Sequence, residues 1–267
     1  MRWRAPVGTM RAMASTWRMP AGSLDRWPAD YERGRPGWPG EAIELAGLLP
    51  TATVLDVGAG TGKLTRLLVR AFAHVFAVEP AEAMRRELMA RCPAANVLNG
   101  TGQDLPLPDA SVDAVFAAEA FHWFFDDQAL VQIARVLRPR GRVVLMWNVP
   151  AGPWDPPIAP VERLLLGRLP HADVGSDPLD LGGLQRVRGD WHGSLSAAGF
   201  EPVRNTRLPN PQTLDREGAV SFFASMGWIA DLADDERLPL LNQVRSLLTV
   251  NTYRRMWETD VHWTQRA

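Results

Sequence analysis

The stretch VLDVGAGTGKLTRLL, residues 54–68, constrains the fold more than any other part of the chain. Residues 53–58 form an apolar run with the length of a buried strand, and residues 63–72 carry leucines at helical spacing. Three glycines stand at every second position between these two patterns: Gly58, Gly60 and Gly62. Because glycine lacks a Cβ, its backbone adopts positive φ and can approach a ligand closely. A strand, a glycine-rich turn and a helix in this order predict a small-molecule site at the carboxyl end of a strand.

Residues 41–148 alternate between strand and helix patterns. Apolar runs predict strands at residues 53–58, 74–79, 96–100, 111–120 and 142–148. Helical spacing of apolar residues predicts helices at residues 41–49, 63–72, 81–92 and 127–137. Strands that alternate with helices are typical of an α/β protein with a doubly wound, mostly parallel sheet and right-handed crossovers.

The composition changes after residue 148. The stretch VPAGPWDPPIAP, residues 149–160, is too rich in proline for the interior of a helix or strand, so residues 149–190 are expected to form a lid or cap. Further helices are predicted at residues 191–200, 216–232 and 236–248, and two strands at residues 201–208 and 258–265 bring the sheet to seven strands. The expected organisation is an N-terminal extension (1–24), a cofactor-binding core (25–148), the cap (149–190) and a C-terminal part with substrate-facing helices (191–267).

Composition and charge narrow the possible partners. A formal net charge of −1 over 267 residues argues against nucleic acid, since domains that bind it usually carry an excess of Lys and Arg. No apolar run approaches the roughly 20 residues that a membrane span needs. The single cysteine, Cys92, fits a reducing compartment, so the cytoplasm is expected. The histidines show no metal-ligand spacing, and no metal site is predicted.

The first 24 residues are basic and contain no acidic side chain before Asp25. Such a segment is either a loose or over-annotated start or a transit peptide. The segment lacks an apolar core of secretory length, and it contains internal methionines at positions 10, 13 and 19. These features favour the loose start.

The glycine spacing decides between ligands. A P-loop requires G-x-x-x-x-G-K-[ST], but Gly58 and Gly62 are too close together, and Leu64 stands where the Mg²⁺-binding hydroxyl belongs. A dinucleotide fingerprint requires G-x-G-x-x-G, which is also absent. ATP hydrolysis is therefore disfavoured. A nicotinamide oxidoreductase is an alternative function, which only the binding of NAD would support.

The sequence VLDVGAGTGKLT resembles motif I of the class I S-adenosylmethionine-dependent methyltransferases, [DE]-x-G-x-G-x-G. Four further segments are similar to this family at the corresponding places: HVFAVE, which ends at Glu79; GTGQDLPLPDASVDAVFAAEAFHWF; IARVLRPRGRVVLMWN; and RGRPGWP. The last segment resembles an R-P-x-Y-P element of a subgroup that acts on small molecules, with Trp38 in place of the tyrosine. The resemblance implies a Rossmann-like methyltransferase fold and S-adenosyl-L-methionine as cofactor.

The resemblance also implies roles for individual residues. The backbone of Gly58 and Gly60 would hold the methionine part of the cofactor, and Asp56 would position their turn. Glu79 would accept hydrogen bonds from the ribose hydroxyls. Further positions would bind the adenine, the cofactor carboxylate or its amino end; these are Thr101, Gly102, Gln103, Tyr31, Arg35 and Glu119. Asp104 is an alternative contact for the adenine.

Simpler structural roles compete with these assignments. Asp56 could cap the turn that follows it, although an acid within VLDVG is costly to bury unless it organises a site. Glu79 could serve as an N-cap for the next helix. Tyr31 and Arg35 could equally be structural, and Trp123 and Phe124 are expected in the core or in the pocket wall.

His122, in EAFHWF just after the fourth strand, is the candidate catalytic residue. Methyl transfer from a sulfonium is an in-line displacement, so the enzyme mainly aligns the acceptor and excludes water. If the acceptor is a hydroxyl, His122 could be the base that takes its proton. A structural imidazole bonded to a neighbouring loop is the alternative.

Methyl transfer to a small-molecule acceptor, on O, N or C, is the predicted function. The alternative is an S-adenosylmethionine-binding fold used as a pathway cyclase or as a regulatory binding protein. Aromatic residues of segments 149–192 and 217–230 would form an apolar acceptor pocket, unless they pack as core. These residues are Trp154, Trp191, Phe222, Phe223, Met226 and Trp228.

Overall fold

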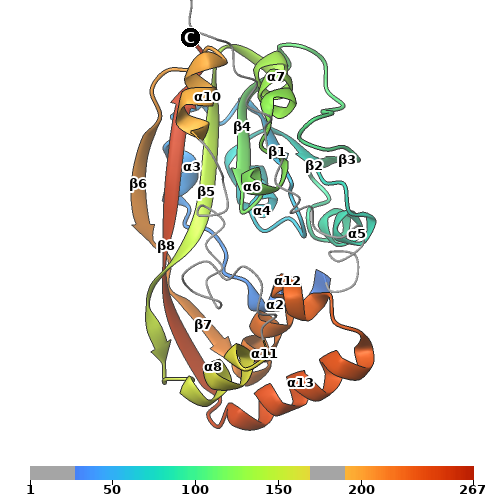
Figure 1. Ribbon diagram of the computed structural model, residues 1–267. Coiled ribbons are helices and arrows are strands. Elements are labelled where there is room, and N and C mark those ends of the chain that lie inside the picture. Colours follow the sequence, from blue (N-terminus) through green and yellow to red (C-terminus); the bar gives the residue numbers. More distant parts are fainter. Residues whose placement is uncertain (1–27, 169–189) are drawn as a thin grey trace, which may run out of the picture.

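The computed structural model describes residues 28–168 and 190–267 (Figure 1). Its centre is an eight-stranded sheet in the order β3-β2-β1-β4-β5-β8-β6, with β7 also paired to β8. The first five strands are β1 (Thr53–Val57), β2 (His74–Val78), β3 (Asn96–Leu98), β4 (Val112–Ala118) and β5 (Leu137–Asp155). They pair in parallel with one another. The predicted α/β class and the parallel part of the sheet are confirmed.

The C-terminal strands complete the sheet in the antiparallel direction. β8 (Thr252–Gln265) runs beside β5, and both β6 (Arg204–Pro209) and β7 (Gln212–Asp215) pair with β8. The sheet has one strand more than predicted because two short strands share the length of β8. β8 also begins earlier than the predicted residue 258.

Helices cover both faces of the sheet (Figure 1). The helices α6 (Phe121–Phe124), α7 (Asp127–Val136) and α10 (Trp191–Ala197) pack against one face, in a core that includes Leu55, Val143 and Trp147. The helices α3 (Glu41–Glu44) and α4 (Thr65–Ala71) cover the other face, and α5 (Glu82–Arg91) packs beside them against Ala77. Successive side chains of a strand point to opposite faces of the sheet, so neighbouring residues of one strand belong to different cores.

Strand β5 corrects the prediction for the proline-rich stretch. The strand continues to Asp155, and α8 (Ala159–Leu166) starts with Pro160 in its first turn. Beyond Met146, β5 pairs only with β8. The other side of this part of β5 is an edge, where a backbone N–H is not required for pairing with a neighbouring strand. Proline is tolerated on edges and at irregularities, and the register shifts between Pro150 and Trp154.

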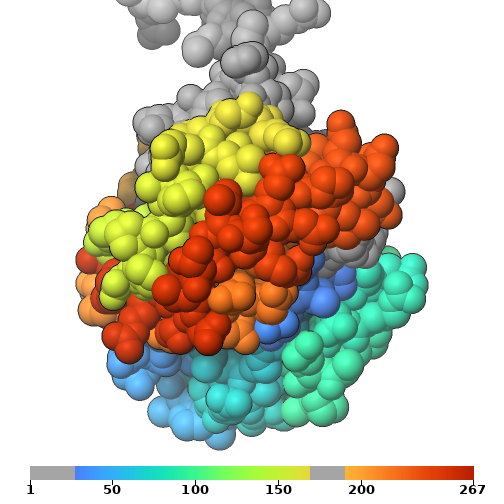
Figure 2. All heavy atoms as spheres, turned by 90° about the horizontal axis from the view of Figure 1, so that it is seen from below, coloured from blue at the N-terminus to red at the C-terminus, as the bar shows by residue number. Residues whose placement is uncertain are grey.

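The far ends of β5 and β8 support a second core. This core is formed by α8, α11 (Arg216–Ala224), α12 (Gly227–Ala230), α13 (Asp234–Leu247) and β7. From here on, the cap means this core and not the segment 149–190 for which a cap was predicted. Figure 2 shows α13 and α8 on the face that the cap presents to solvent. The single helix predicted for residues 216–232 is divided into α11 and α12, because Met226 is extended at the start of α12.

An N-terminal strap, residues 28–39, links the sheet half to the cap. It begins with α2 (Pro28–Gly34), which packs against α11 and also contacts α5. A Cβ at Gly34 would lie 2.2 Å from the backbone nitrogen of Phe222, so the two backbones touch. The atoms of the strap lie between the cap and the α5 side of the sheet in Figure 2.

The predictions for residues 1–24 and for residues 169–189 of the segment 149–190 lie outside the described residues. Within residues 28–168 and 190–267, no helix is long and apolar enough to cross a membrane. The same ranges contain no group of His, Cys, Asp and Glu side chains that could hold a metal ion.

Candidate active site

The glycine-rich turn follows β1 with the geometry that its sequence predicts. Gly58, Gly60 and Gly62 have φ of 70°, 57° and 88°, a region that disfavours residues with a Cβ. The backbone N–H of Gly58 donates to the carbonyl of Val78 (2.8 Å), so the turn is held at the end of β2. A Cβ at Gly60 would meet no atom within 4 Å, whereas a Cβ at Gly58 would lie 2.6 Å from the Cβ of Ala120. The backbone at Gly60 therefore faces open space.

Asp56 is buried beneath this turn. Its Oδ2 accepts a hydrogen bond from the hydroxyl of Thr65 (2.6 Å) in the first turn of α4. Burial raises the pKa of Asp56 to about 7, the Thr65 hydrogen bond lowers it, and the nearby Glu79 raises it further. The carboxyl thus ties β1 to α4 and fixes the glycine-rich turn between them.

Glu79 directly follows the last residue of β2 and is buried, with 3% of its surface exposed. Its Oε2 accepts from the N–H of Gly60 (2.9 Å), and its Oε1 accepts from the N–H of Ala81 (2.8 Å), the residue that precedes α5. The N-cap of α5 is Ala81, so the alternative role of Glu79 as N-cap residue does not hold; Glu79 instead accepts from the N–H of that N-cap residue. A carboxylate oxygen can accept more than one hydrogen bond.

The strap carries Tyr31 and Arg35 into the same region. The Arg35 Nε donates to the hydroxyl of Ser225 (2.8 Å), and its Nη2 donates to the Ser225 carbonyl (2.8 Å). Its guanidinium lies 5.7 Å from the centroid of the Tyr31 ring. Desolvation raises the pKa of Tyr31 to about 12, against the opposing effect of Arg35. The Tyr31 hydroxyl is therefore neutral at physiological pH.

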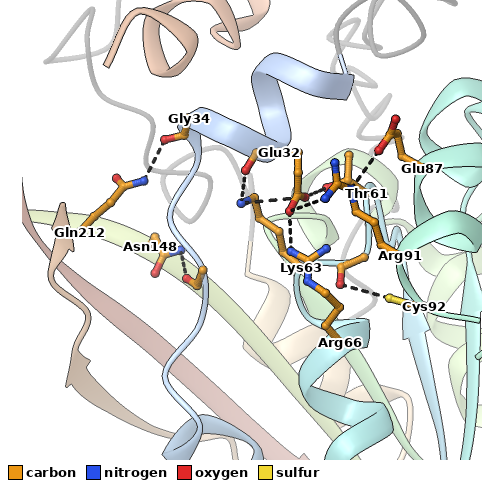
Figure 3. A network of polar contacts seen from close by, with 12 residues as sticks. Glu32, Gly34, Thr61, Lys63, Arg66, Glu87, Arg91, Cys92, Asn148 and Gln212 are labelled. Atoms are coloured by element: carbon orange, nitrogen blue, oxygen red, sulfur yellow. Dashed lines mark hydrogen bonds and ion pairs between the residues drawn. The ribbon is translucent and has the colours of Figure 1, made fainter. Parts of the chain in front are cut away.

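Glu32, which the sequence analysis missed, anchors the strap to the glycine-rich turn (Figure 3). Its Oε2 accepts from the hydroxyl of Thr61 (2.6 Å), and its Oε1 accepts from Arg66 Nη2 (2.7 Å) on α4. The Lys63 ammonium donates to the Glu32 carbonyl (2.6 Å). Burial lowers the pKa of Lys63 to about 8, although the Glu32 charge raises it. No local pattern marks Glu32, because its partners come from a distant turn.

The other side of the strap is held by side-chain amides of β5, of β7 and of the turn between β6 and β7. Gln212 donates to the Gly34 carbonyl (2.9 Å), and Asn148 and Asn210 both donate to the Gly37 carbonyl (3.2 and 2.8 Å; Figure 3 shows the Gln212 and Asn148 contacts). The strap is thus bonded to the glycine-rich turn at one end and to β5 and β7 at the other.

The loop after β3 carries the residues that were predicted to contact the adenine. Thr101 and Gly102 line the cavity, and a Cβ at Gly102 would lie 2.3 Å from the Phe124 ring. Gln103 does not join them. Its amide donates to the Phe124 carbonyl (2.8 Å) and to Asp126 (3.0 Å), so it braces the segment between α6 and α7 instead.

The end of β4 carries Glu119 and His122. Glu119 has φ of 50°, an uncommon conformation for a residue with a side chain, and its Oε1 accepts from the Asn148 N–H (2.8 Å). The Nδ1 of His122 accepts from the indole N–H of Trp147 (3.2 Å). Both residues line the cavity where the carboxyl end of β4 lies beside the middle of β5.

These elements line one cavity with a volume of about 220 Å³. All residues predicted to bind the cofactor or to act in catalysis line it, except Gln103 and the alternative adenine contact Asp104. The remaining wall includes residues that the sequence did not assign to the site: Trp257, Asn148, Ser225, Gly227, Ala230 and Met84. Trp123 and Phe124 also line it, in agreement with the expected core or pocket wall, and Trp38 lines it as well.

The predicted aromatic acceptor pocket is wrong. Trp154, Phe222, Phe223 and Met226 are buried in the cap core, Trp228 is partly buried against that core, and Trp191 is buried against the sheet. None of these side chains lines the cavity, so the packing alternative holds for them. Their apolar character is explained by the second core.

The residues present fit S-adenosylmethionine. The open space beside the Gly60 backbone is a cradle that any Cβ would fill, and Glu79 offers buried carboxylate lone pairs next to it. Arg35 is a cation suited to a carboxylate, and Glu119 is an anion suited to an ammonium or sulfonium group. Both line the cavity together with the glycine-rich turn.

Comparisons with known proteins agree with this site. The sequence profile of the methyltransferase domain family matches residues 55–145. An uncharacterized methyltransferase-like protein of Schizosaccharomyces pombe is 32% identical over 216 residues, which is 78% of this chain and 79% of that protein. The chain therefore belongs to the S-adenosylmethionine-dependent methyltransferase family.

Other relatives match a shorter segment. An uncharacterized methyltransferase of Mycobacterium tuberculosis is 52% identical over 120 residues, 44% of this chain and 49% of that protein. A malonyl-[acyl-carrier protein] O-methyltransferase of Methylococcus capsulatus is 43% identical over 114 residues, 39% of this chain and 41% of that protein. The chain thus spans about half the length, or less, of these curated relatives. The solved structure of a putative type II methyltransferase from Anaeromyxobacter dehalogenans shares the fold, with a TM-score of 0.58, 22% identity and coverage of 86% of this chain and 97% of that one.

Proposed function

We propose that the protein transfers the methyl group of S-adenosylmethionine to a small-molecule acceptor. The observation that carries the proposal is the convergence of five sequence segments on one cavity. The strap, the glycine-rich turn, the ends of β2 and β4, and the loop after β3 each contribute lining residues. The near-neutral net charge supports a small acceptor over nucleic acid, and the buried free thiol of Cys92 supports a reducing compartment such as the cytoplasm.

Bound S-adenosylmethionine supplies an activated methyl group on a good leaving group. The protein then needs to align the acceptor and exclude water. Glu79 and the backbone at Gly60 hold one side of the cavity, and Tyr31 and Arg35 of the strap close the other. Trp38 lines the cavity from the segment that resembles the R-P-x-Y-P element, which supports the small-molecule subgroup.

Three relatives described above carry methyltransferase names, which favours methyl transfer over non-methylating chemistry. The test is incubation of the full chain with methyl-labelled S-adenosylmethionine and a panel of small acids, alcohols and amines. The proposal predicts a labelled product and one S-adenosylhomocysteine for each methyl transferred. Cofactor binding without any labelled product across the panel would favour the non-methylating alternative.

A further inference from the structure

Glu32 carries all the hydrogen bonds and ion pairs that join α2 to the sheet half among the residues that the structure describes (Figure 3). Its carboxylate accepts from the hydroxyl of Thr61 (2.6 Å) and from Nη2 of Arg66 (2.7 Å). The Lys63 ammonium donates to its backbone carbonyl (2.6 Å), and the Arg91 guanidinium on α5 lies 4.0 Å from the carboxylate. One residue of the strap is thus bonded to the glycine-rich turn and to α4, with a cation of α5 beside it.

The rest of α2 is fixed to the cap. Asp30 accepts from Nη2 of Arg237 on α13 (2.8 Å), and Arg33 pairs with Asp215, which directly precedes α11 (2.9 Å). The backbone at Gly34 is in direct contact with that of α11. The helix therefore belongs to the cap, and its bonds to the sheet half depend on one residue.

The environment of Glu32 makes its bonds stronger than those of a surface ion pair. Its side chain is 14% exposed, whereas Arg33 and Asp215 are 51% and 65% exposed. Solvent screens exposed pairs, so they contribute little, but hydrogen bonds to an ionised and sheltered carboxylate are among the strong ones. Loss of the Glu32 carboxylate should therefore weaken the attachment of α2 to the sheet half.

The two walls of the cavity belong to the two halves of the molecule. Tyr31 lies in α2, and Arg35 is bonded to Ser225 at the end of α11, so both are attached to the cap. Gly60 and Glu79 line the same cavity from the sheet half. A cofactor held by both walls requires that the cap and the sheet half lie together.

The strands that connect the two halves are irregular where they enter the cap. β5 and β8 pair over both halves, and their register shifts between Pro150 and Trp154. Irregularities of this kind bend a strand locally, and hinges consist of a few residues that absorb a change of backbone angles. This stretch is suited to a rotation of the cap relative to the sheet half.

We propose, on the basis of the methyl transfer proposed above, that Glu32 is a positioning residue for the cofactor. Its bonds keep the cap closed on the sheet half and thereby hold Tyr31 and Arg35 over the cofactor. Without the carboxylate, the cap and α2 rotate away together about the stretch between Pro150 and Trp154. Only the closed form has the complete cavity, so the apparent affinity for the cofactor is the affinity of the closed form multiplied by the closed fraction.

The closed fraction is measured without any ligand, by pulsed electron spin resonance on the full chain. Spin labels are placed at Met89→Cys on α5 and Leu238→Cys on α13, two exposed positions, in a Cys92→Ala background that removes the natural thiol. We expect one narrow distance distribution when Glu32 is present. Glu32→Gln should add a population at a longer distance.

Glu87→Gln is the matched control. Glu87 pairs with Arg91 (2.9 Å) in the same group of charges but is not bonded to the strap among the described residues, so its loss removes an equal charge and no contact of the strap. Its distance distribution should match that of the wild type. An unchanged distribution in Glu32→Gln would overturn the proposal.

Glu32→Gln leaves the Arg66 and Lys63 cations without their carboxylate. If this variant does not fold, Glu32→Gln/Arg66→Gln, which removes one cation together with the acid, takes its place with the same expectations. Circular dichroism checks the fold of each variant.

The cofactor role is tested by calorimetric titration of the same substitutions, without labels, with S-adenosylhomocysteine. The affinity of Glu32→Gln should fall by the factor by which its closed fraction falls, so a loss of about tenfold corresponds to about one molecule in ten in the closed form. Glu87→Gln should bind as the wild type does. A Glu32→Gln variant that opens and yet binds equally well would overturn the positioning role. Wild-type protein that binds no S-adenosylhomocysteine would refute the proposed function instead, while the distances still decide whether Glu32 keeps the cap closed.

Discussion

The two ends of strand β5 belong to regions that are built by different means. Beside the first half of β5, the cavity is lined by backbone groups and acidic side chains at the ends of strands. Examples are the turn at Gly58 and the carboxylate of Glu79. Around its second half, the cap buries charged side chains among aromatic rings. Arg255 lies 4.5 Å from the Trp257 ring centroid, and Arg237 pairs with Asp30 at 2.8 Å. The sheet half thus depends on local geometry, and the cap on contacts between distant segments.

The family profile covers residues 55–145, which lie within the sheet half. The strap is the part that joins the two regions, because Glu32 bonds to the glycine-rich turn and Gly34 packs on α11. We expect substitutions where the strap packs against α11 to affect stability most, and substitutions of exposed side chains to affect it least. Four substitutions test this order.

Gly34→Ala should have the largest effect. The new Cβ would lie within 2.5 Å of the Phe222 and Ser221 backbone, so α2 and α11 must separate. We expect a loss of about 3 kcal/mol in the free energy of unfolding, by overpacking, measured by chemical denaturation. Gly37→Ala is the matched control, since its Cβ would meet no atom within 4 Å. Equal stability of the two variants would show that the close packing of α2 against α11 does not contribute to stability.

Asp56→Asn should remove a pH dependence of stability. The pKa of Asp56 is raised to about 7 by burial, above the value near 4 of an unfolded chain. The protonated carboxyl therefore stabilises the fold below about pH 4, and this contribution is lost as the pH rises through about 7. Between pH 5 and pH 8 the wild type should lose on the order of 2 kcal/mol more than the variant.

Denaturation at both pH values measures this difference. The Asn side chain keeps an oxygen that can accept from Thr65, so the hydrogen bond need not be lost with the charge. Glu44→Gln removes an exposed carboxylate and serves as the control. A pH dependence that persists in Asp56→Asn would assign it to another group.

Gly60→Ala separates binding from stability. The φ of 57° makes alanine unfavourable by about 1 kcal/mol, with no clash, but the Cβ enters the space beside the backbone. S-adenosylhomocysteine affinity should fall about tenfold or more, measured by calorimetry. Gly58→Ala, which adds a contact with Ala120 at 2.6 Å, should also lose more stability than Gly60→Ala. Unchanged affinity of Gly60→Ala would place the ligand elsewhere.

Arg33→Ala should have the smallest effect. Arg33 pairs with Asp215 at 2.9 Å, but the two side chains are 51% and 65% exposed. Exposed ion pairs are screened by solvent and contribute little. We expect a change within about 0.5 kcal/mol in the free energy of unfolding. A larger loss in low salt would show that this pair helps to fasten the strap to the cap.

The same contrast explains what the sequence could predict. The strands from β1 to β4 and the glycine-rich turn follow from local patterns, and most predicted site residues lie in or next to them. The end of β5 could not be predicted, because proline is excluded only where a strand has neighbours on both sides. Glu32 reaches the glycine-rich turn, and Trp257 reaches the cavity, through contacts with segments far away in sequence. The aromatic residues of α11 were assigned to a pocket because composition alone does not distinguish a second core from a binding site.

Calorimetric titration of the full chain with S-adenosylhomocysteine tests the central claim most directly. Glu79→Ala removes the carboxylate beside Gly60, and Arg33→Ala controls for a change outside the cavity. We predict micromolar binding by the wild type and by Arg33→Ala, and loss of binding by Glu79→Ala. Folded wild-type protein that binds no S-adenosylhomocysteine, or a Glu79→Ala variant that binds it equally well, would contradict the assignment of this cavity to the cofactor.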